Sequence, residues 1–295
     1  MRERALRIGE PSPLAAVATE PPDFDWRRPA VLILNSGVMH HVGSCRLSVK
    51  VAREVAGRGM LAIRFDFSGV GDSEPRRGTQ SFEETSTREC SEVMDYIERT
   101  KGTKQFIVFG LCSGADAAYN TALADDRVVG FAQIDGYCYV TWRYYLRRYW
   151  PAVVDPRRWA RLLGRRRFWR RSSRSSVEGI SDEFMELPAY RRVFPSRLEV
   201  AKGLRSLVRR DVNMYVNFTG GEPHYNYAQQ FQDAFRDVDF RGLLKVDYYP
   251  LTNHIITQAD DQRTIVANIS GWAAGLPGMA LPVEEHEPVR TSQTA

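Results

Sequence analysis

The sequence predicts an α/β protein with a mostly parallel central sheet flanked by helices. Short apolar runs alternate with helical patterns along most of the 295 residues, and such alternation implies a parallel sheet covered on both faces. A hydrophobic content of 43% suits a globular chain, and no apolar run approaches the roughly 20 residues of a membrane span. A Gly-x-Cys-x-Gly turn at 110–114 also separates an apolar run from a helix rich in small residues.

Eight apolar runs of strand length follow one another along the chain. The predicted strands are 5–8, 14–18, 30–36, 61–67, 106–109, 128–135, 213–218 and 244–249. The first two suit an antiparallel hairpin that leads into the sheet. The third is bounded by Pro29 and Gly37, and a glycine-rich turn at 68–73 follows the fourth.

Helical patterns separate most of these runs. The predicted helices are 47–56, 82–99, one that begins after 112, 227–238 and 260–274. Gly57 ends the first helix, and carboxylates occupy the first turn of the second. In the last helix, Ile265, Ile269 and Trp272 recur at helical spacing.

An insertion interrupts the alternation after the sixth strand. We therefore expect a first core segment, an inserted helical cap, a second core segment and a disordered tail. These are residues 1–136, 137–211, 212–276 and 277–295. Between 141 and 174 the cap carries 12 arginines, no lysine and one aspartate, a formal charge of +11 in a chain whose net charge is +5. Aromatic residues are interleaved with these arginines.

The turn at 110–114 has the pattern of a nucleophile elbow, in which a strand turns sharply into a helix and leaves one reactive side chain at the tip. With Cys112 at the tip, the positions two before and two after it are Gly110 and Gly114. With Ser113 at the tip they would be leucine and alanine, which suit the close packing of the turn less well. We therefore predict a cysteine nucleophile. The alternative is that Cys112 is only a small buried apolar residue.

Four segments, taken in order, resemble the α/β-hydrolase superfamily. They are 35–38 (Asn-Ser-Gly-Val), 64–73 (Arg-Phe-Asp-Phe-Ser-Gly-Val-Gly-Asp-Ser), the turn at 110–114 and the pair 253–254 (Asn-His). The resemblance covers residues 5–276 and is strongest to the aminopeptidase, esterase and thioesterase branch with an inserted cap. Dienelactone hydrolases and polyhydroxyalkanoate synthases are members of the superfamily with cysteine at the tip.

The resemblance implies a catalytic triad of Cys112, a histidine and an acid. His254 follows the last strand, and in this fold the loop after that strand lies next to the elbow. A neutral imidazole there can take the thiol proton and return it to a leaving group. Glu222, the first carboxylate after the seventh strand, is the favoured acid because the acid usually stands there. Asp135, after the sixth strand, is the rival.

By the same resemblance, the backbone amides of Val38 and Ser113 form the oxyanion hole. His40 and His41 follow the third strand and are expected either to line the substrate pocket or to have a solvated or packing role. Tyr137 is a further candidate for the pocket wall. Tyr145, with the other aromatic residues of the cap, is another.

The arginines of the cap are the candidate partner surface, because guanidinium groups pair with phosphates and carboxylates. We place docking at Arg165, Arg166, Arg167 and Arg170. Their first-choice partner is coenzyme A or the phosphopantetheine arm of an acidic acyl carrier protein. An anionic membrane surface ranks second, and nucleic acid, for which no motif is present, ranks last. The simpler alternative is a solvated helix face.

A cysteine at the elbow gives a thioester intermediate, which is an activated acyl donor. The sequence thus predicts a thioesterase or acyltransferase with a thioacyl-Cys112 intermediate, for example in secondary metabolism. The alternatives are a simple carboxylic ester or amide hydrolase, and a non-catalytic binding protein on the same scaffold. We expect no metal and no separate cofactor, since the four cysteines lack metal-ligand spacing. No secretory signal is visible, so a cytoplasmic location is expected.

Overall fold

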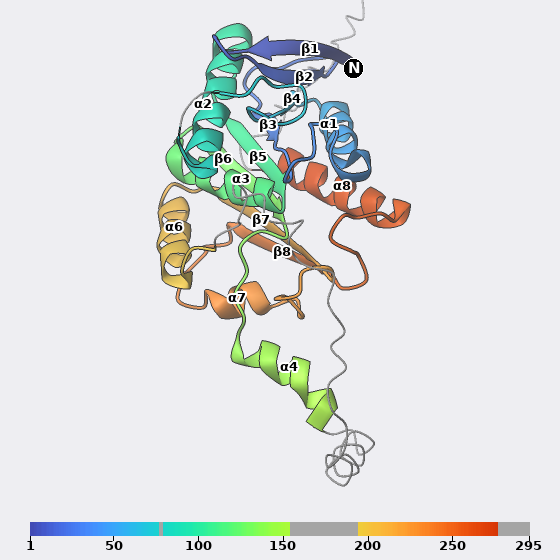
Figure 1. Cartoon of the computed structure of the whole chain (residues 1–295), viewed down its shortest axis with the longest axis vertical. Helices are drawn as coiled ribbons and strands as arrows, with labels where there is room; N and C mark the ends of the chain where they lie inside the picture. Colours follow the sequence, from blue (N-terminus) through green and yellow to red (C-terminus); the bar gives the residue numbers. More distant parts are fainter. Residues whose placement is uncertain (77–78, 154–193, 277–295) are drawn as a thin grey trace, which may run out of the picture.

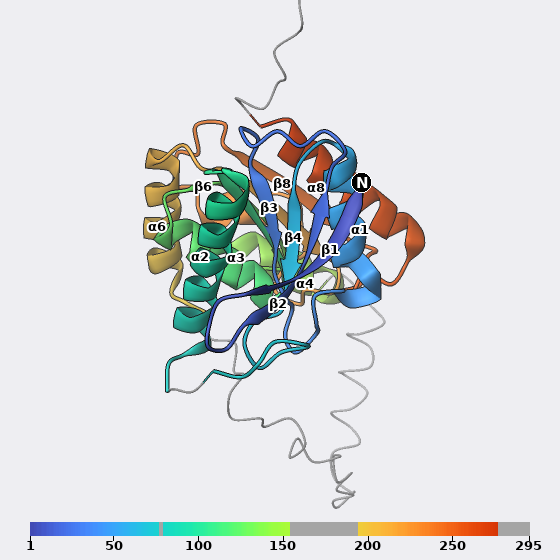
Figure 2. The ribbon, with the colours of Figure 1, turned by 90° about the horizontal axis from the view of Figure 1, so that it is seen from above.

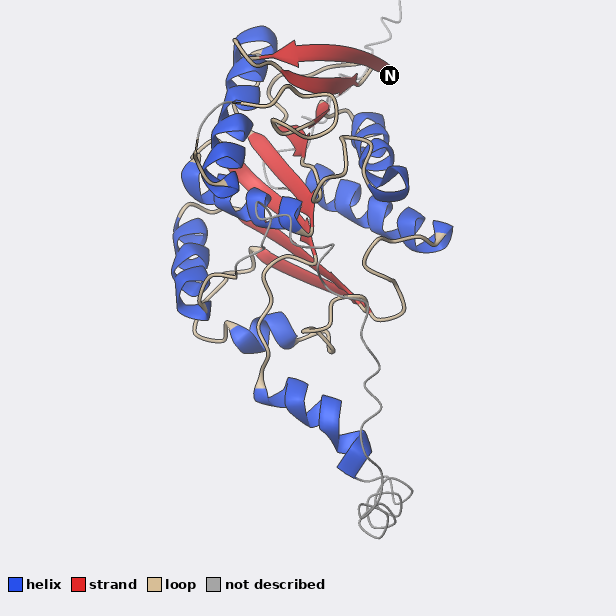
Figure 3. Cartoon of the chain, viewed as in Figure 1, coloured by secondary structure: helices blue, strands red, loops and turns tan. Residues whose placement is uncertain are grey.

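The computed structural model describes residues 1–76, 79–153 and 194–276. Within them, eight strands form one sheet in the order β1-β2-β4-β3-β5-β6-β7-β8. β2 is antiparallel to both β1 and β4, and every other neighbouring pair is parallel. The strands are β1 Arg2–Ile8, β2 Leu14–Glu20, β3 Ala30–Ile33, β4 Ala62–Phe65, β5 Phe106–Leu111, β6 Val128–Ile134, β7 Asn213–Thr219 and β8 Leu244–Tyr249. The predicted fold class and N-terminal hairpin are confirmed (Figure 3).

Helices cover both faces of the sheet (Figures 1 and 2). One face carries α1 (Leu47–Gly57) and α8 (Ala259–Ala274), and the other carries α2 (Phe82–Lys101), α3 (Ser113–Ala124) and α6 (Arg197–Arg209). Alternate residues of a strand enter the two cores, since side chains point to opposite faces of a sheet. In β5, Phe106 and Val108 join the core under α2 and α3, and Ile107 and Phe109 join the core under α1 and α8.

Helix α6 falls in the stretch predicted as cap, yet it packs on the core as the crossover between β6 and β7. Val200 and Leu204 are buried in the same cluster as the apolar side chains of α3. The Tyr119 hydroxyl of α3 donates a hydrogen bond to the Val200 carbonyl at 3.2 Å. Gly203 permits this approach, because a Cβ there would lie 2.0 Å from the Tyr119 hydroxyl oxygen. The core therefore resumes with α6, earlier than the predicted boundary at 212.

Three short elements complete the described chain. The 3-10 turn η1 (Ser44–Arg46) precedes α1, and α7 (Gln230–Ala234) is shorter than the predicted helix 227–238. Helix α4 (Trp142–Val153) follows β6 and extends away from the sheet (Figure 1). The rest of the predicted cap, 154–193, and the tail 277–295 lie outside the described residues. No described helix is long and apolar enough to cross a membrane.

The sheet also determines where a site can form. The carboxyl ends of β5, β6 and β8 lie at one edge, because these strands are parallel. The loops that follow them carry Cys112, Asp135 and His254. Ligands of open α/β sheets bind at this edge.

Candidate active site

Cys112 lies at the sharp turn between β5 and α3. Its backbone has φ 56° and ψ −120°, a conformation that few residues with a side chain adopt. Its amide donates a hydrogen bond to the Ile134 carbonyl at 2.9 Å, and the residue is partly exposed. The geometry is that of the predicted elbow, with the cysteine at its tip.

The turn requires its two glycines. A Cβ at Gly110 would lie 2.0 Å from the Gly114 carbonyl oxygen, and a Cβ at Gly114 would lie 2.2 Å from the Asn35 carbonyl oxygen. Both obstacles are backbone atoms, so they cannot rotate aside as a side chain can. A side chain at either position would push the elbow away from its neighbours.

We expect Gly114→Ala to lower the free energy of unfolding by at least about 2 kcal/mol, because its methyl group would overlap the Asn35 carbonyl. Gly57→Ala is the matched control, since a Cβ at Gly57 meets nothing within 4 Å. Urea unfolding of both variants measures the difference. Equal midpoints for the two variants would contradict the close packing of the elbow.

His254, in the loop between β8 and α8, pairs with a buried aspartate. Its Nδ1 lies 2.7 Å from Oδ2 of Asp135, whose side chain is fully buried. The Asp135 carboxylate also accepts hydrogen bonds from the amide and the hydroxyl of Thr219, each at 2.7 Å. These donors hold the carboxylate in place, so it can fix the orientation of the imidazole.

Two glycines let the loop that carries His254 come this close. A Cβ at Gly221 would lie 2.2 Å from the His254 amide nitrogen, and a Cβ at Gly220 would lie 2.1 Å from the Pro250 carbonyl oxygen. The loops after β7 and β8 therefore pack backbone against backbone. The Gly-Gly pair is the local reason why the histidine reaches Asp135.

The hydrogen bond to Asp135, followed by a side-chain hydrogen bond to Cys112, raises the pKa of His254 from 6.5 to about 10, against the opposing effect of burial. The imidazole thus contacts the thiol on one side and the carboxylate on the other. The shift indicates that both partners favour the charged imidazolium. The three side chains form one connected set at the carboxyl edge of the sheet.

The same shift predicts a pH-dependent contribution to stability. The pKa of His254 is higher in the folded chain than its ordinary value of 6.5, so its stabilising effect is complete below pH 6.5 and is lost as the pH rises through about 10. The difference in free energy of unfolding between wild type and His254→Gln should shrink over that interval. Chemical denaturation near each end measures it. A difference that does not change with pH would contradict the pairing.

Glu222, the acid favoured from the sequence, does not pair with His254, so that prediction is corrected in favour of its rival. Its Oε1 accepts a hydrogen bond from the His224 amide at 3.0 Å and lies 3.0 Å from the ring Nδ1 of the same residue. Glu222 therefore stabilises its own turn. The prediction rested on where the acid usually stands, whereas the carboxylate that lies 2.7 Å from His254 Nδ1 is that of Asp135.

The loop after β3 is tied to the elbow. The Gly37 amide donates a hydrogen bond to the Ser113 hydroxyl oxygen at 2.8 Å. In the part of the chain that the structure describes, the amides of Val38 and Ser113 donate no hydrogen bond. Both stay the predicted oxyanion donors. The part played by the Ser113 hydroxyl has no signal in the sequence beyond its position next to Cys112.

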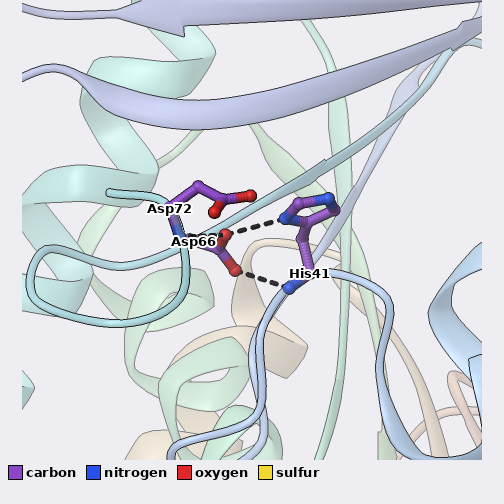
Figure 4. A group of neighbouring side chains, drawn as sticks. All are labelled: His41, Asp66 and Asp72. Atoms are coloured by element: carbon purple, nitrogen blue, oxygen red, sulfur yellow. Dashed lines mark hydrogen bonds and ion pairs between the residues drawn. The ribbon is translucent and has the colours of Figure 1, made fainter. Parts of the chain in front are cut away.

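His41 is engaged with Asp66 (Figure 4), which favours the packing alternative for this residue. Asp66 is fully buried, and its Oδ2 lies 2.7 Å from His41 Nδ1 and accepts the Asp72 amide at 3.1 Å. Burial alone would raise the pKa of Asp66, but hydrogen bonds from His41, Asn35 and the Asp72 amide hold it below its usual value.

This network has the closest grouping of potential metal ligands among the described residues: ligand atoms of His41, Asp66 and Asp72 lie within 4.8 Å of one another. Asp66 already accepts several hydrogen bonds, including one from Asn35 Nδ2 at 2.9 Å. We therefore infer that these hydrogen bonds hold the loop after β3 against the turn after β4.

His40 is exposed and lies beside the turn after β4. A Cβ at Gly71 would come within 2.7 Å of the His40 Cβ.

The remaining predicted site residues lie elsewhere. Tyr137 is buried and packs edge to face on Tyr119, with ring centroids 5.7 Å apart, and its place in the pocket wall stays a prediction. Tyr145 lies on α4 and is 49% exposed. The predicted docking residues Arg165, Arg166, Arg167 and Arg170 lie outside the described residues.

Thr219 is the functional candidate that sequence analysis missed. It is the last residue of β7 and donates two hydrogen bonds to Asp135. A signal was present, because β6 and β7 were both predicted and the carboxyl ends of adjacent parallel strands meet. A hydroxyl at the end of one strand could thus have been matched to the carboxylate after its neighbour.

Fold and site together define a class. An α/β-hydrolase enzyme has a nucleophilic side chain at a strand–turn–helix elbow. It also has a histidine after the last strand, and a buried acid orients this histidine. The family model of the serine aminopeptidases, S33, matches residues 27–183, which is more than half of the chain. The chain belongs to this family.

Solved structures with this fold cover almost the whole chain. An α/β serine hydrolase without a lid from Xanthomonas campestris has a TM-score of 0.54 and 16% identity, and the match covers 95% of this chain and 97% of that one. A dienelactone hydrolase from Anabaena variabilis has a TM-score of 0.56 and 11% identity, with coverages of 92% and 96%. A proline iminopeptidase from Mycobacterium smegmatis has a TM-score of 0.52 and 16% identity, with coverages of 92% and 97%. No curated protein sequence matches the chain.

Proposed function

We propose that this hydrolase carries the acyl group of its substrate as a thioester on Cys112. One observation supports this most strongly: the side chain at the elbow is a thiol that is hydrogen-bonded to His254, which is itself bonded to Asp135. The name of the family refers to serine, so the sulfur is the distinctive feature of this chain. A thiol next to an imidazole is an effective nucleophile.

The proposed reaction has two halves. The proton shared by Sγ and His254 rests on the imidazole, whose pKa is raised to about 10. Sγ attacks the acyl carbon, so that a C–S bond forms and the carbonyl electron pair moves onto oxygen. The amides of Val38 and Ser113 donate to this oxyanion. The bond to the leaving group then breaks, and the leaving group receives the proton from His254. In the second half, water or another nucleophile gives a proton to His254 and attacks the thioester; the C–S bond breaks and the thiol is restored.

Acyl thioesters are the preferred substrate class in this proposal. Exchange between an incoming thioester and Cys112 is nearly balanced in free energy, because one C–S bond replaces another. Coenzyme A or a carrier protein would then deliver the acyl group, and the arginines at 165–170 would receive their phosphates. A reducing compartment such as the cytoplasm would protect the thiol. The second candidate, hydrolysis of a simple ester or amide, is favoured by the family match.

A matched pair of substrates tests the substrate class. The pair is a coenzyme A thioester and a small oxygen ester with the same acyl chain. We expect turnover of both, with the higher kcat/KM for the thioester, and a selective loss of thioester turnover in Arg165→Glu/Arg166→Glu/Arg167→Glu. Turnover of the oxygen ester alone would support the simple hydrolase. No turnover of either would support a binding protein without catalysis.

The Ser113 hydroxyl has a positioning role in this proposal. Ser113→Ala removes the acceptor for the Gly37 amide, and this loosens the loop that carries the oxyanion donor Val38. We expect kcat to fall by about 3- to 10-fold with little change in KM, since the oxyanion forms only in the reaction. Ser113→Thr keeps the hydroxyl and should restore kcat. Equal losses in both variants would contradict this role.

A further inference from the structure

Helix α4 presents a row of large apolar side chains to solvent. Trp142, Tyr145, Leu146, Tyr149 and Trp150 follow the i, i+3, i+4, i+7, i+8 spacing of one helix face. Each is between 47% and 70% exposed. We call these five residues the aromatic stripe. Scattered exposed apolar residues are ordinary, whereas a contiguous patch marks a contact surface.

Contacts on the opposite side of α4 show that the aromatic stripe faces away from the body of the protein. The Tyr144 hydroxyl donates a hydrogen bond to the Pro223 carbonyl at 2.8 Å, and Asn226 Nδ2 donates to the Tyr144 carbonyl at 3.1 Å. Arg143 pairs with Asp233 at 3.0 Å. The body thus holds one side of the helix, and α4 extends beyond the sheet (Figure 1).

The charge on α4 is entirely positive. Between 142 and 150 there are three arginines and no acidic residue. Arg143 lies three residues before Leu146, and Arg148 three residues after Tyr145, so arginines border the stripe on both sides. Arg147 lies over the ring of Tyr227 at 5.3 Å. A partner for this helix must therefore combine apolar and anionic groups within a few ångströms.

We propose that the aromatic stripe docks on the surface of an anionic lipid bilayer. Tryptophan and tyrosine favour the boundary between headgroups and acyl chains, and the exposed Arg148 can extend to an anionic headgroup while its stem covers hydrocarbon. A second copy of the chain fits less well, because its arginines would face like charges. An acidic protein would match the arginines and leave the apolar side chains without a partner.

Docking through α4 would also bring the catalytic set close to the bilayer. Pro223 and Asn226, which contact α4, belong to the loop after β7. At Gly221 the same loop packs against the backbone of His254. An enzyme held in this way would draw substrate from the lipid interface.

Vesicle co-sedimentation of the full chain tests the proposal, with phosphatidylglycerol/phosphatidylcholine vesicles compared with pure phosphatidylcholine. We expect binding to the anionic vesicles that weakens with salt. Leu146→Gln/Trp150→Gln should lower the partition coefficient at least ~10-fold, and Arg148→Gln about 5-fold. The matched control is Trp26→Gln/Leu198→Gln, which removes one tryptophan and one leucine, 56% and 68% exposed, away from α4 and should bind like wild type.

Catalytic variants keep this test separate from the proposed reaction, because Cys112→Ala should bind vesicles as well as wild type. Equal binding to both kinds of vesicle, no binding, or wild-type binding by Leu146→Gln/Trp150→Gln would each overturn the proposal. A wild-type dimer in solution that becomes a monomer in Leu146→Gln/Trp150→Gln would also overturn the proposal, since the stripe would then bind a second copy. A thermal unfolding midpoint like that of wild type shows that this double variant is folded.

Discussion

Replacing Cys112 with alanine should lower the turnover of an activated ester or thioester by about 10³-fold or more. No C–S bond can form in this variant, while the proposed oxyanion donors Val38 and Ser113 remain and account for any residual rate. Cys112→Ser should fold equally well and keep a reduced activity, because the hydroxyl still neighbours His254. Steady-state kinetics with a chromogenic ester provides the measurement.

The matched control is Cys45→Ala, which removes an exposed thiol and should leave turnover unchanged. Its retained rate would show that the loss in Cys112→Ala does not come from the absence of any one cysteine. Equal turnover in wild type and Cys112→Ala would remove the mechanism. Equal loss in both alanine variants would assign the effect to something other than the elbow.

Asp135→Asn should lower kcat by about 10²- to 10⁴-fold, because the amide cannot stabilise an imidazolium and can favour the wrong tautomer of His254. The hydrogen bond to Asp135 is the largest cause of the raised pKa of His254. The pKa of His254 should therefore fall in this variant. Kinetics and a histidine NMR titration measure the two effects independently.

Glu222→Gln is the matched control for the acid. Glu222 contacts His224 and not His254, so we expect kcat within about 2-fold of wild type and an unchanged His254 pKa. A loss of kcat in Glu222→Gln that exceeds the loss in Asp135→Asn would restore Glu222 as the acid. Near-wild-type kcat in Asp135→Asn would contradict any orienting role for this carboxylate.

The elbow was predictable because its geometry restricts which residues can occupy the turn. A turn that brings the backbone of Gly114 against Asn35 excludes a side chain at that position, and only glycine meets this requirement. The same logic identified Cys112 rather than Ser113 as the tip. His254 was predictable from its place after the last strand, because in this fold the loop after that strand lies next to the elbow.

The acid was not predictable by the same reasoning. Asp135 and Glu222 both follow strands that end at the carboxyl edge of the sheet, and both are buried. The choice depends on the positive φ of Asp135 and on the hydrogen bonds from Thr219. Such features belong to the tertiary structure, and a single sequence carries no direct sign of them.

Helix α6 shows a second limit of the sequence. Its residues were assigned to the predicted cap, and nothing in the local sequence indicates whether an apolar helix face packs on the sheet or on a cap. The contact of Gly203 with Tyr119 decides it, and this contact joins positions 84 residues apart in the chain. The aromatic residues of 142–150 were likewise expected to line the active site, whereas four of them face solvent.

Intact-mass spectrometry of the enzyme, quenched during turnover of an acyl thioester, tests the thioacyl intermediate most directly. We predict a mass increase equal to one acyl group minus a hydrogen, released by hydroxylamine and mapped to the peptide that contains Cys112. Burial raises the pKa of the Cys90 thiol to about 12, so no adduct is expected there. Turnover without any adduct under conditions that trap a slow substrate, or an adduct mapped to another residue, would contradict the account.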